Sequence, residues 1–265
     1  MNTSEIEALF VKTNIGDYEA DDAREAISIL RQNGDRAVFD RTAAWCHADE
    51  PRKRARAVAI LCQLQCPCVS DASVNEPGWL FRDEAYALVT EMLEHENDSV
   101  VLDSAISALG HLGNPTVIPR IVRYQDHADE NVRFAAAFAL GCFPNDEQSV
   151  SSLLKLTTDP DSKVRDWAVF GLGVQGDADS ADIREALLRC LEDPDEDVRE
   201  EAAVGLGKRR GQRLIPKLLA MLEEPELKVR VAEAAAAMLG LDRDPDEWVA
   251  ADYRAALLTE RQVSN

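Results

Sequence analysis

Four stretches in the second half of the chain share one pattern of apolar and polar positions. Each begins with an acidic turn, continues with Val-Arg and ends in a run of small and apolar residues. The stretches are HADENVRFAAAFALG (127–141), DPDSKVRDWAVFGLG (159–173), DPDEDVREEAAVGLG (193–207) and EPELKVRVAEAAAAML (224–239). Their arginines recur at intervals of 32, 34 and 31 residues: Arg133, Arg165, Arg199 and Arg230. A fixed period of this length is typical of stacked-repeat proteins.

Within each copy, the small and apolar residues predict one buried face of a helix. Counted from the arginine they stand at −1, +3, +6 and +7, positions that share about a third of the helical circumference. In the second copy these are Val164, Ala168, Gly171 and Leu172. Glycine or alanine at +6 favours close approach of a neighbouring helix.

Polar residues at the start of each copy predict how its helix begins. An acidic residue four positions before each arginine is placed to cap the helix or interact with its dipole. These residues are Asp129, Asp161, Asp195 and Glu226. The arginines lie one turn further on, where we expect a structural ladder of pairs with acidic residues of adjacent turns.

The periodicity predicts a single all-α, right-handed α-solenoid of about six to seven helix pairs over residues 1–265. Its parts are an N-terminal cap (1–19), degenerate repeats (20–113), regular repeats (114–241) and a C-terminal capping helix (242–265). First helices of the regular repeats are expected at 116–125, 147–158, 181–192 and 213–223, and second helices begin near 131, 162, 196 and 227. A connection rich in Pro, Ser, Asn and Gly, 66–79, is predicted to be an insertion between repeats.

Composition narrows the class of partner. With 29 basic and 49 acidic residues, the formal net charge is −20. Such a surface repels phosphate groups, so we expect no direct binding to nucleic acid and none to an anionic membrane. It attracts basic proteins, although the same charge also keeps a protein soluble. The oligomeric state is left open.

Two further features bear on location. The first residues contain no basic segment followed by a long apolar run, and no run of about 18 apolar residues occurs, so neither a signal peptide nor a membrane span is expected. The six cysteines are scattered through the chain. This pattern favours free thiols in a reducing compartment, so we expect a cytoplasmic protein.

The pattern D-x-x-x-VR-x-x-A-x-x-x-LG resembles the short bacterial repeats of the HEAT family. The resemblance covers 114–241 strongly and 20–113 more weakly. The layout, with a Trp after Val-Arg-Asp and a degenerate front half, also resembles small HEAT proteins encoded beside Rhs-type toxin genes, which implies a binding protein and an immunity role. The alternative is similarity to HEAT-like phycobilin lyases, which implies an enzyme subunit that attaches a tetrapyrrole to a partner protein.

In HEAT-like proteins the second helices line a concave face, which the resemblance places at positions +1, +4, +5 and +8. The residues expected there to bind a partner are Phe134, Phe138, Asp166, Phe170, Glu200 and Val204. Together they would form an aromatic patch with an acidic rim. The alternative, that the phenylalanines pack between neighbouring helices, stays open. Trp167, at +2, is interpreted as a packing residue.

The sequence offers no convincing chemistry for catalysis. Cys62, Cys66 and Cys68, with Cys46 upstream, lack the second ligand pair of a zinc site, so we expect no metal. One His-Glu pair, His95-Glu96, is too few for the di-iron centre of the HEAT-repeat deoxyhypusine hydroxylases that it resembles. No triad or phosphate loop is present, and the negative charge argues against a DNA glycosylase. We therefore expect a non-enzymatic binding scaffold with no cofactor and a basic protein partner.

Overall fold

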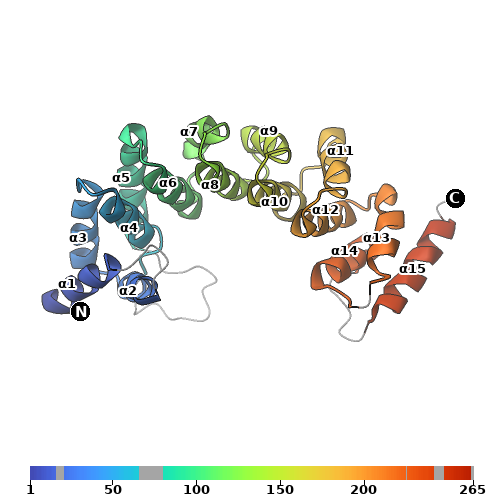
Figure 1. The fold of residues 1–265 in the computed structure, drawn as a ribbon, viewed down its shortest axis with the longest axis horizontal. Coiled ribbons are helices and arrows are strands. Elements are labelled where there is room, and N and C mark those ends of the chain that lie inside the picture. Colours follow the sequence, from blue (N-terminus) through green and yellow to red (C-terminus); the bar gives the residue numbers. More distant parts are fainter. Residues whose placement is uncertain (16–20, 66–79, 225, 242–247, 264–265) are drawn as a thin grey trace. The chain divides into compact units, whose positions relative to one another are not determined.

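The computed structural model describes residues 1–15, 21–65, 80–224, 226–241 and 248–263. Over these residues the chain forms helices and turns and contains no β-strand element (Figure 1), as the all-α prediction requires. The chain divides into two compact units, Met1–Ala139 (unit 1) and Leu140–Asn265 (unit 2). No helix within the described ranges is long and apolar enough to cross a membrane.

Unit 1 is built from helices that pack in pairs. The elements are α1 (Thr3–Thr13), α2 (Asp21–Gln32), α3 (Arg36–Cys46), α4 (Pro51–Leu61), α5 (Arg82–His95), α6 (Ser99–Leu112), η1 (Pro115–Val117), α7 (Ile118–Ile121), η2 (Val122–Tyr124) and α8 (Glu130–Gly141), which extends two residues past the division. Helices α2, α4 and α6 pack on one another in sequence, and α3 packs on α5. The result is two layers, one of first helices and one of second helices.

Unit 2 repeats this arrangement. Its elements are α9 (Glu147–Leu156), α10 (Ser162–Phe170), the π-helical turn η3 (Gly171–Gln175), α11 (Ala181–Cys190), α12 (Glu196–Lys208), η4 (Gln212–Leu214), α13 (Ile215–Met221), α14 (Val229–Leu239) and α15 (Ala250–Val263). Helices α10, α12 and α14 pack side by side and are called the second-helix layer below. The last helix, α15, packs on α13 and α14.

The predicted buried stripe is present in the second-helix layer. Val164, Ala168 and Leu172 of the second copy are at most 1% exposed, and the same positions of the third copy are equally buried. The sequence predicts the starts of α10 and α12 because an aspartate caps each: Asp161 and Asp195 accept hydrogen bonds from backbone N–H groups of the first turn.

The fourth copy departs from the predicted pattern. Its helix α14 begins at Val229, two residues later than expected, and Val229 is 79% exposed instead of buried. The cap residue is Lys228, which makes no side-chain cap hydrogen bond, so Glu226 does not cap this helix. Glutamate is a poorer N-cap than the aspartates of the other copies because its longer side chain suits that geometry less well.

Glycine at +6 permits the close approach that the sequence predicts. A Cβ atom added to Gly205 would lie 2.6 Å from the Cα atom of Gly173, a distance that real Cβ atoms do not tolerate. Added to Gly171, it would lie 3.1 Å from the Cα atom of Gly141. Backbones of consecutive second helices therefore touch directly at these points.

Several predicted first helices are shorter or more broken than expected. The helix expected at 116–125 is divided into η1, α7 and η2, and the one expected at 213–223 begins with the 3₁₀ turn η4. Prolines at positions 115, 119 and 216 lie in these segments and lack the N–H that a continuous helix uses. The predicted insertion 66–79 lies outside the described residues, as do Cys66 and Cys68. A single continuous solenoid stays a prediction.

Candidate functional site

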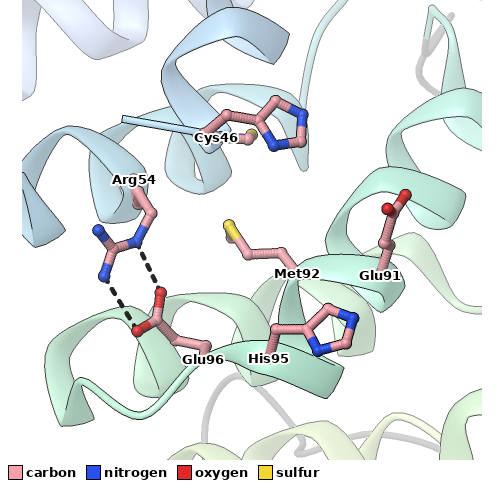
Figure 2. A pocket seen from close by; sticks show the side chains of 7 residues that line it. Cys46, Arg54, Glu91, Met92, His95 and Glu96 are labelled. Atoms are coloured by element: carbon pink, nitrogen blue, oxygen red, sulfur yellow. Dashed lines mark hydrogen bonds and ion pairs between the residues drawn. The ribbon is translucent and has the colours of Figure 1, made fainter. Parts of the chain in front are cut away.

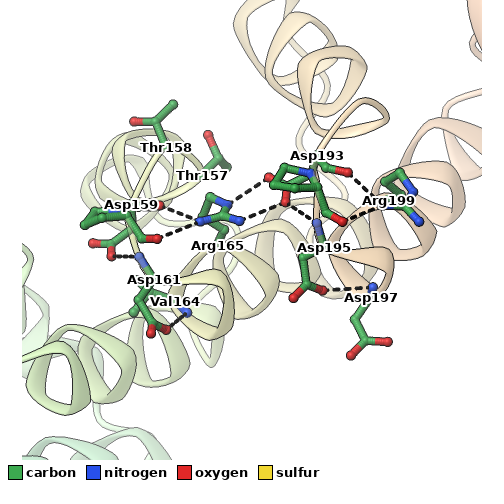
Figure 3. A network of polar contacts seen from close by, with 12 residues as sticks. Thr157, Thr158, Asp159, Asp161, Val164, Arg165, Asp193, Asp195, Asp197 and Arg199 are labelled. Carbon is green, nitrogen blue, oxygen red and sulfur yellow. Dashed lines mark hydrogen bonds and ion pairs between the residues drawn. The ribbon is translucent and has the colours of Figure 1, made fainter.

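The repeated arginine connects consecutive repeats in unit 2 (Figure 3). Arg165 of α10 donates from Nη1 to the carbonyl oxygens of Asp159 and Pro160, 2.8 and 3.1 Å away, in the turn before its own helix. Its Nε and Nη2 atoms donate to the two carboxylate oxygens of Asp193, each at 2.8 Å. Asp193 lies in the corresponding turn of the next repeat, so one guanidinium fastens two turns.

The next arginine repeats half of this geometry. Nη1 of Arg199 donates to the carbonyl oxygens of Asp193 and Pro194, at 2.8 and 2.9 Å (Figure 3). Burial alone would raise the pKa of Asp193, but the hydrogen bonds from Arg165 and from the backbone N–H of Asp195, with the charges of Arg165 and Arg199, together outweigh it and hold the pKa below its usual range. The Asp193 carboxylate therefore stays charged and occupied, which leaves it unsuited to binding a partner.

Unit 1 contains the same construction. Arg54 donates to the carbonyl oxygens of Ala48 and Asp49 and, through Nε and Nη2, to the carboxylate of Glu96 at 2.7 and 3.0 Å. Arg133 donates to the carbonyl oxygens of its own turn, those of His127 and Ala128.

A different arrangement surrounds Arg230, the last arginine of the series. Six residues of the second-helix layer gather there and are called the acid–aromatic cluster: Asp166, Trp167 and Phe170 of α10, Glu201 of α12, and Arg230 and Glu233 of α14. Arg230 makes ion pairs of 2.7 Å with Glu201 and with Glu233. Its guanidinium carbon lies 5.7 Å from the centre of the Phe170 ring, within cation–π distance.

The two aromatic residues of the cluster lie edge to face. The ring centroids of Trp167 and Phe170 are 5.5 Å apart, and the planes meet at 80°. Both side chains are half-buried. They therefore combine packing against the layer with some surface left accessible.

The carboxylates of the cluster are incompletely satisfied. Asp166 Oδ1 and Glu201 Oε2 are both buried and accept no hydrogen bond from the described part of the chain. Burial raises the pKa of Glu201 to about 7, opposed by the charge of Arg230 and helped by the charges of Asp166 and Glu233. Burial also raises the pKa of Asp166 to about 6, together with the charges of Asp197 and Asp195. Strong shifts of this kind, beside specific charged partners, are typical of functional sites.

Comparison with known proteins identifies the family. A family model described as HEAT repeats matches residues 86–173 and 150–240, more than half of the chain. The chain belongs to the HEAT-repeat family. Each turn with its following second helix, as at Arg165, is thus part of one HEAT repeat.

Individual HEAT proteins are also similar to the chain. Protein YibA of Escherichia coli K12 is 30% identical over 109 residues, which span 39% of this chain and 38% of YibA. The matched stretch is thus well under half of the relative's length. A crystal structure of E. coli YibA superposes with a TM-score of 0.72 at 21% identity and covers 99% of this chain and 93% of its own.

A second solved structure is similar in fold at lower identity. The complex of CpcE and CpcF of phycocyanin lyase from Nostoc sp. PCC7120 gives a TM-score of 0.50 at 14% identity, over 97% of this chain and 94% of the matched chain. At these identities the likeness concerns the α-solenoid fold of the HEAT repeats, and it says nothing of activity.

The HEAT repeats distribute the predicted partner-binding residues unevenly. Asp166 and Phe170 meet in the acid–aromatic cluster. Glu200 lies one residue before Glu201, with a side chain 12% exposed and 3.1 Å from Lys228. Val204, expected on the solvent side, is fully buried and has no exposed surface with which to contact a partner.

The remaining two phenylalanines belong to the HEAT repeats of unit 1. Phe134 and Phe138 on α8 are both half-buried. The ring of Phe138 lies 5.0 Å from that of His111 on α6. Each side chain is thus partly covered and keeps some exposed surface, and a role of these phenylalanines in binding a partner stays a prediction.

Sequence reasoning missed Glu201 and Asp103. Both carboxylates sit among apolar HEAT-repeat residues, on the second helices α12 and α6. Burial, with the charge of Asp129, raises the pKa of Asp103 to about 6. The available signal was a charged residue at or beside a buried position: Glu201 stands at +2, where Trp167 stands one repeat earlier.

A pocket of about 250 Å³ in unit 1 contains the His95-Glu96 pair considered above (Figure 2). It is lined by Cys46, His47, Met92 and His95, with the ion pair of Arg54 and Glu96 at one side. Burial raises the pKa of Cys46 to about 12, so the thiol is not an activated nucleophile. Within the described ranges, no group of three or more His, Cys, Asp or Glu side chains is placed to hold a metal ion.

Proposed function

We propose that this HEAT protein is a non-enzymatic scaffold that holds a basic protein partner on the second-helix layer of unit 2. The supporting observation is the charge balance of the acid–aromatic cluster. Three carboxylates, Asp166, Glu201 and Glu233, face one guanidinium, that of Arg230. A partner that supplies positive charge there would neutralise carboxylates that the fold leaves unsatisfied.

The aromatic side chains supply the second requirement of a binding surface. Interfaces obtain most of their binding energy from a few residues, among which aromatic rings and arginines are enriched. Trp167 and Phe170 provide such rings, and the net charge of −20 favours encounter with a basic protein over long range.

A narrower form of the proposal gives the partner a biological role. The layout of the chain resembles that of small HEAT proteins encoded beside toxin genes. A basic toxin, such as a nuclease, would then be neutralised by steric occlusion on this layer. Co-expression tests this role directly: the protein should restore growth to cells that express the toxin, and an Asp166→Asn variant should restore less.

The test of the scaffold itself uses the full chain as bait in lysate of the native host, at low and at moderate salt. We expect one basic protein to be retained by the wild type and reduced by Asp166→Asn and by Phe170→Ala. The matched control is Asp182→Asn, which removes the same charge from the exposed start of α11. Equal retention by all four baits, or no retained protein, would contradict the proposal.

The same preparation distinguishes the lyase alternative. A tetrapyrrole mixed with the full chain should keep its free absorbance spectrum if the protein is a scaffold. A shifted, saturable absorbance band would instead support the function of the phycocyanin lyase that the fold is similar to.

A further inference from the structure

The fold already places one guanidinium group against the acid–aromatic cluster. Arg230 reaches from α14 to carboxylates of its own helix and of α12, and it lies against the Phe170 ring of α10. The environment therefore suits a guanidinium group, because carboxylates form ion pairs with it and an aromatic ring lies against it.

Arg230 does not satisfy the whole cluster. It pairs with Glu201 through Oε1, and it leaves Oε2 of the same carboxylate buried without a hydrogen-bond donor. Glu201 is 8% exposed, so water is largely excluded from this carboxylate. Oδ1 of Asp166 is likewise buried and accepts no hydrogen bond from the described residues. When Asp166, Glu201, Glu233 and Arg230 are all ionised, the cluster carries a net charge of −2, so the charge of Arg230 does not balance the three carboxylates.

The cluster contains a second aromatic ring beside Phe170. Asp166 directly precedes Trp167 on α10, and Trp167 meets Phe170 edge to face. A carboxylate beside two aromatic rings accepts an arginine better than a lysine. The planar guanidinium can stack on a ring while donating two hydrogen bonds to a carboxylate, whereas a lysine ammonium is a strongly hydrated point charge.

We infer that the cluster is an arginine-recognition site: a partner's arginine pairs with Asp166 and lies against Trp167 and Phe170, next to Arg230. This inference rests on the proposed scaffold function and specifies the chemistry of the group that the scaffold recognises. Glu201 and Asp166 repel each other electrostatically. The positive charge of the partner's arginine reduces that repulsion and so favours the ionised form of Glu201 as well.

The test titrates the full chain with three capped hexapeptides, Gly-X-Gly-Gly-X-Gly, in which X is arginine, lysine or citrulline. Citrulline keeps the size and planarity of arginine and lacks its charge. Binding is followed by ¹H–¹⁵N NMR, with the indole N–H of Trp167 assigned by a Trp167→Phe variant among the four tryptophans. We expect the arginine peptide to shift that signal and to bind roughly tenfold more tightly than the citrulline peptide.

Variants separate local recognition from general attraction. Asp166→Asn should lower the affinity for the arginine peptide by roughly fivefold. Asp182→Asn, which removes the same charge from α11, should change that affinity by less than about twofold. Equal weakening by both variants, equal binding of all three peptides, or an unmoved Trp167 signal would overturn the inference. If the lysate test retains a partner whose capture depends on Phe170 but not on Asp166, arginine recognition fails while the scaffold proposal stands.

Discussion

Replacing Glu201 with glutamine should stabilise the protein, and the gain should grow as the pH rises. The pKa of this carboxyl is 4.5 in a free chain and about 7 in the folded protein, because burial penalises its charged form. Between these two values the unfolded chain has lost the proton that the folded chain still binds, so a rise in pH favours unfolding. Below 4.5 both states are protonated, and the penalty is absent; above 7 it is complete.

The size of the effect follows from the two pKa values. At 1.36 kcal/mol per pKa unit, the ionisable carboxyl costs about 1 kcal/mol of stability at pH 5.5 and about 3 kcal/mol at pH 8. Glutamine fills the same space, can still accept a hydrogen bond from Arg230, and does not titrate. Its advantage over wild type should therefore increase by about 2 kcal/mol between pH 5.5 and pH 8.

Urea denaturation followed by far-ultraviolet circular dichroism at both pH values measures this difference. Other titrating groups, such as Asp103 and His111, are common to both proteins, so their effects largely cancel. Glu185→Gln is the matched control, since Glu185 is exposed on α11. The difference in the free energy of unfolding between this variant and the wild type should not grow with pH. An advantage of Glu201→Gln that stays constant or shrinks as the pH rises would refute burial as the cause of the shift.

Three further substitutions test the packing of unit 2 by thermal or urea denaturation. Arg165→Ala should cost about 2–3 kcal/mol because it leaves a buried carboxylate unpaired, whereas the exposed Arg213→Ala should change little. Gly205→Ala should cost about 1–3 kcal/mol through overpacking against Gly173 of η3. Gly211→Ala should be tolerated, because the nearest atom to the added Cβ would lie 3.4 Å away. Arg209→Lys should cost about 2 kcal/mol, since one ammonium cannot replace a guanidinium that donates to five backbone carbonyls.

A role in binding accounts for the presence of Glu201, a residue that lowers the stability of the fold. A buried carboxylate with an unsatisfied oxygen lowers stability throughout the neutral pH range, and glutamine would remove the penalty without changing the shape of the side chain. Sites that are costly for the fold are common where binding requires them. The structural penalty and the proposed recognition of a basic partner are therefore two consequences of the same carboxylate.

The parts of the fold that sequence predicts well are those set by local chemistry. Asp161 and Asp195 cap the helices that follow them, so the starts of α10 and α12 were predictable to the residue. Where the cap is missing, in the fourth copy, the predicted start was wrong by two residues. The broken first helices were also missed, because the expected helices 116–125 and 213–223 were taken as continuous although Pro119 and Pro216 lie within them.

The candidate site was only partly predictable because it depends on how repeats superpose. The periodicity predicts that Phe170 and Asp166 lie outside the buried stripe of α10, and both are half-buried members of the cluster. It does not specify which side chain of a neighbouring repeat they meet, because that depends on the register in which helices about 30 residues apart pack. Arg230 was therefore expected to continue the ladder of Arg165, yet it pairs with Glu201 and Glu233. Val204 was assigned to the surface by the same reasoning and is buried.

The π-helical turn at the end of α10 has a consequence for the order of events during synthesis. The carbonyl oxygens of Leu172 and Gly173 accept hydrogen bonds from Arg209, a residue made 37 and 36 positions later. Until Arg209 has left the ribosome, the end of that helix has no donor for these oxygens except water. The end of this HEAT repeat is thus completed by a residue of the repeat translated after it, so it should stay loosely ordered in the growing chain until Arg209 has been made.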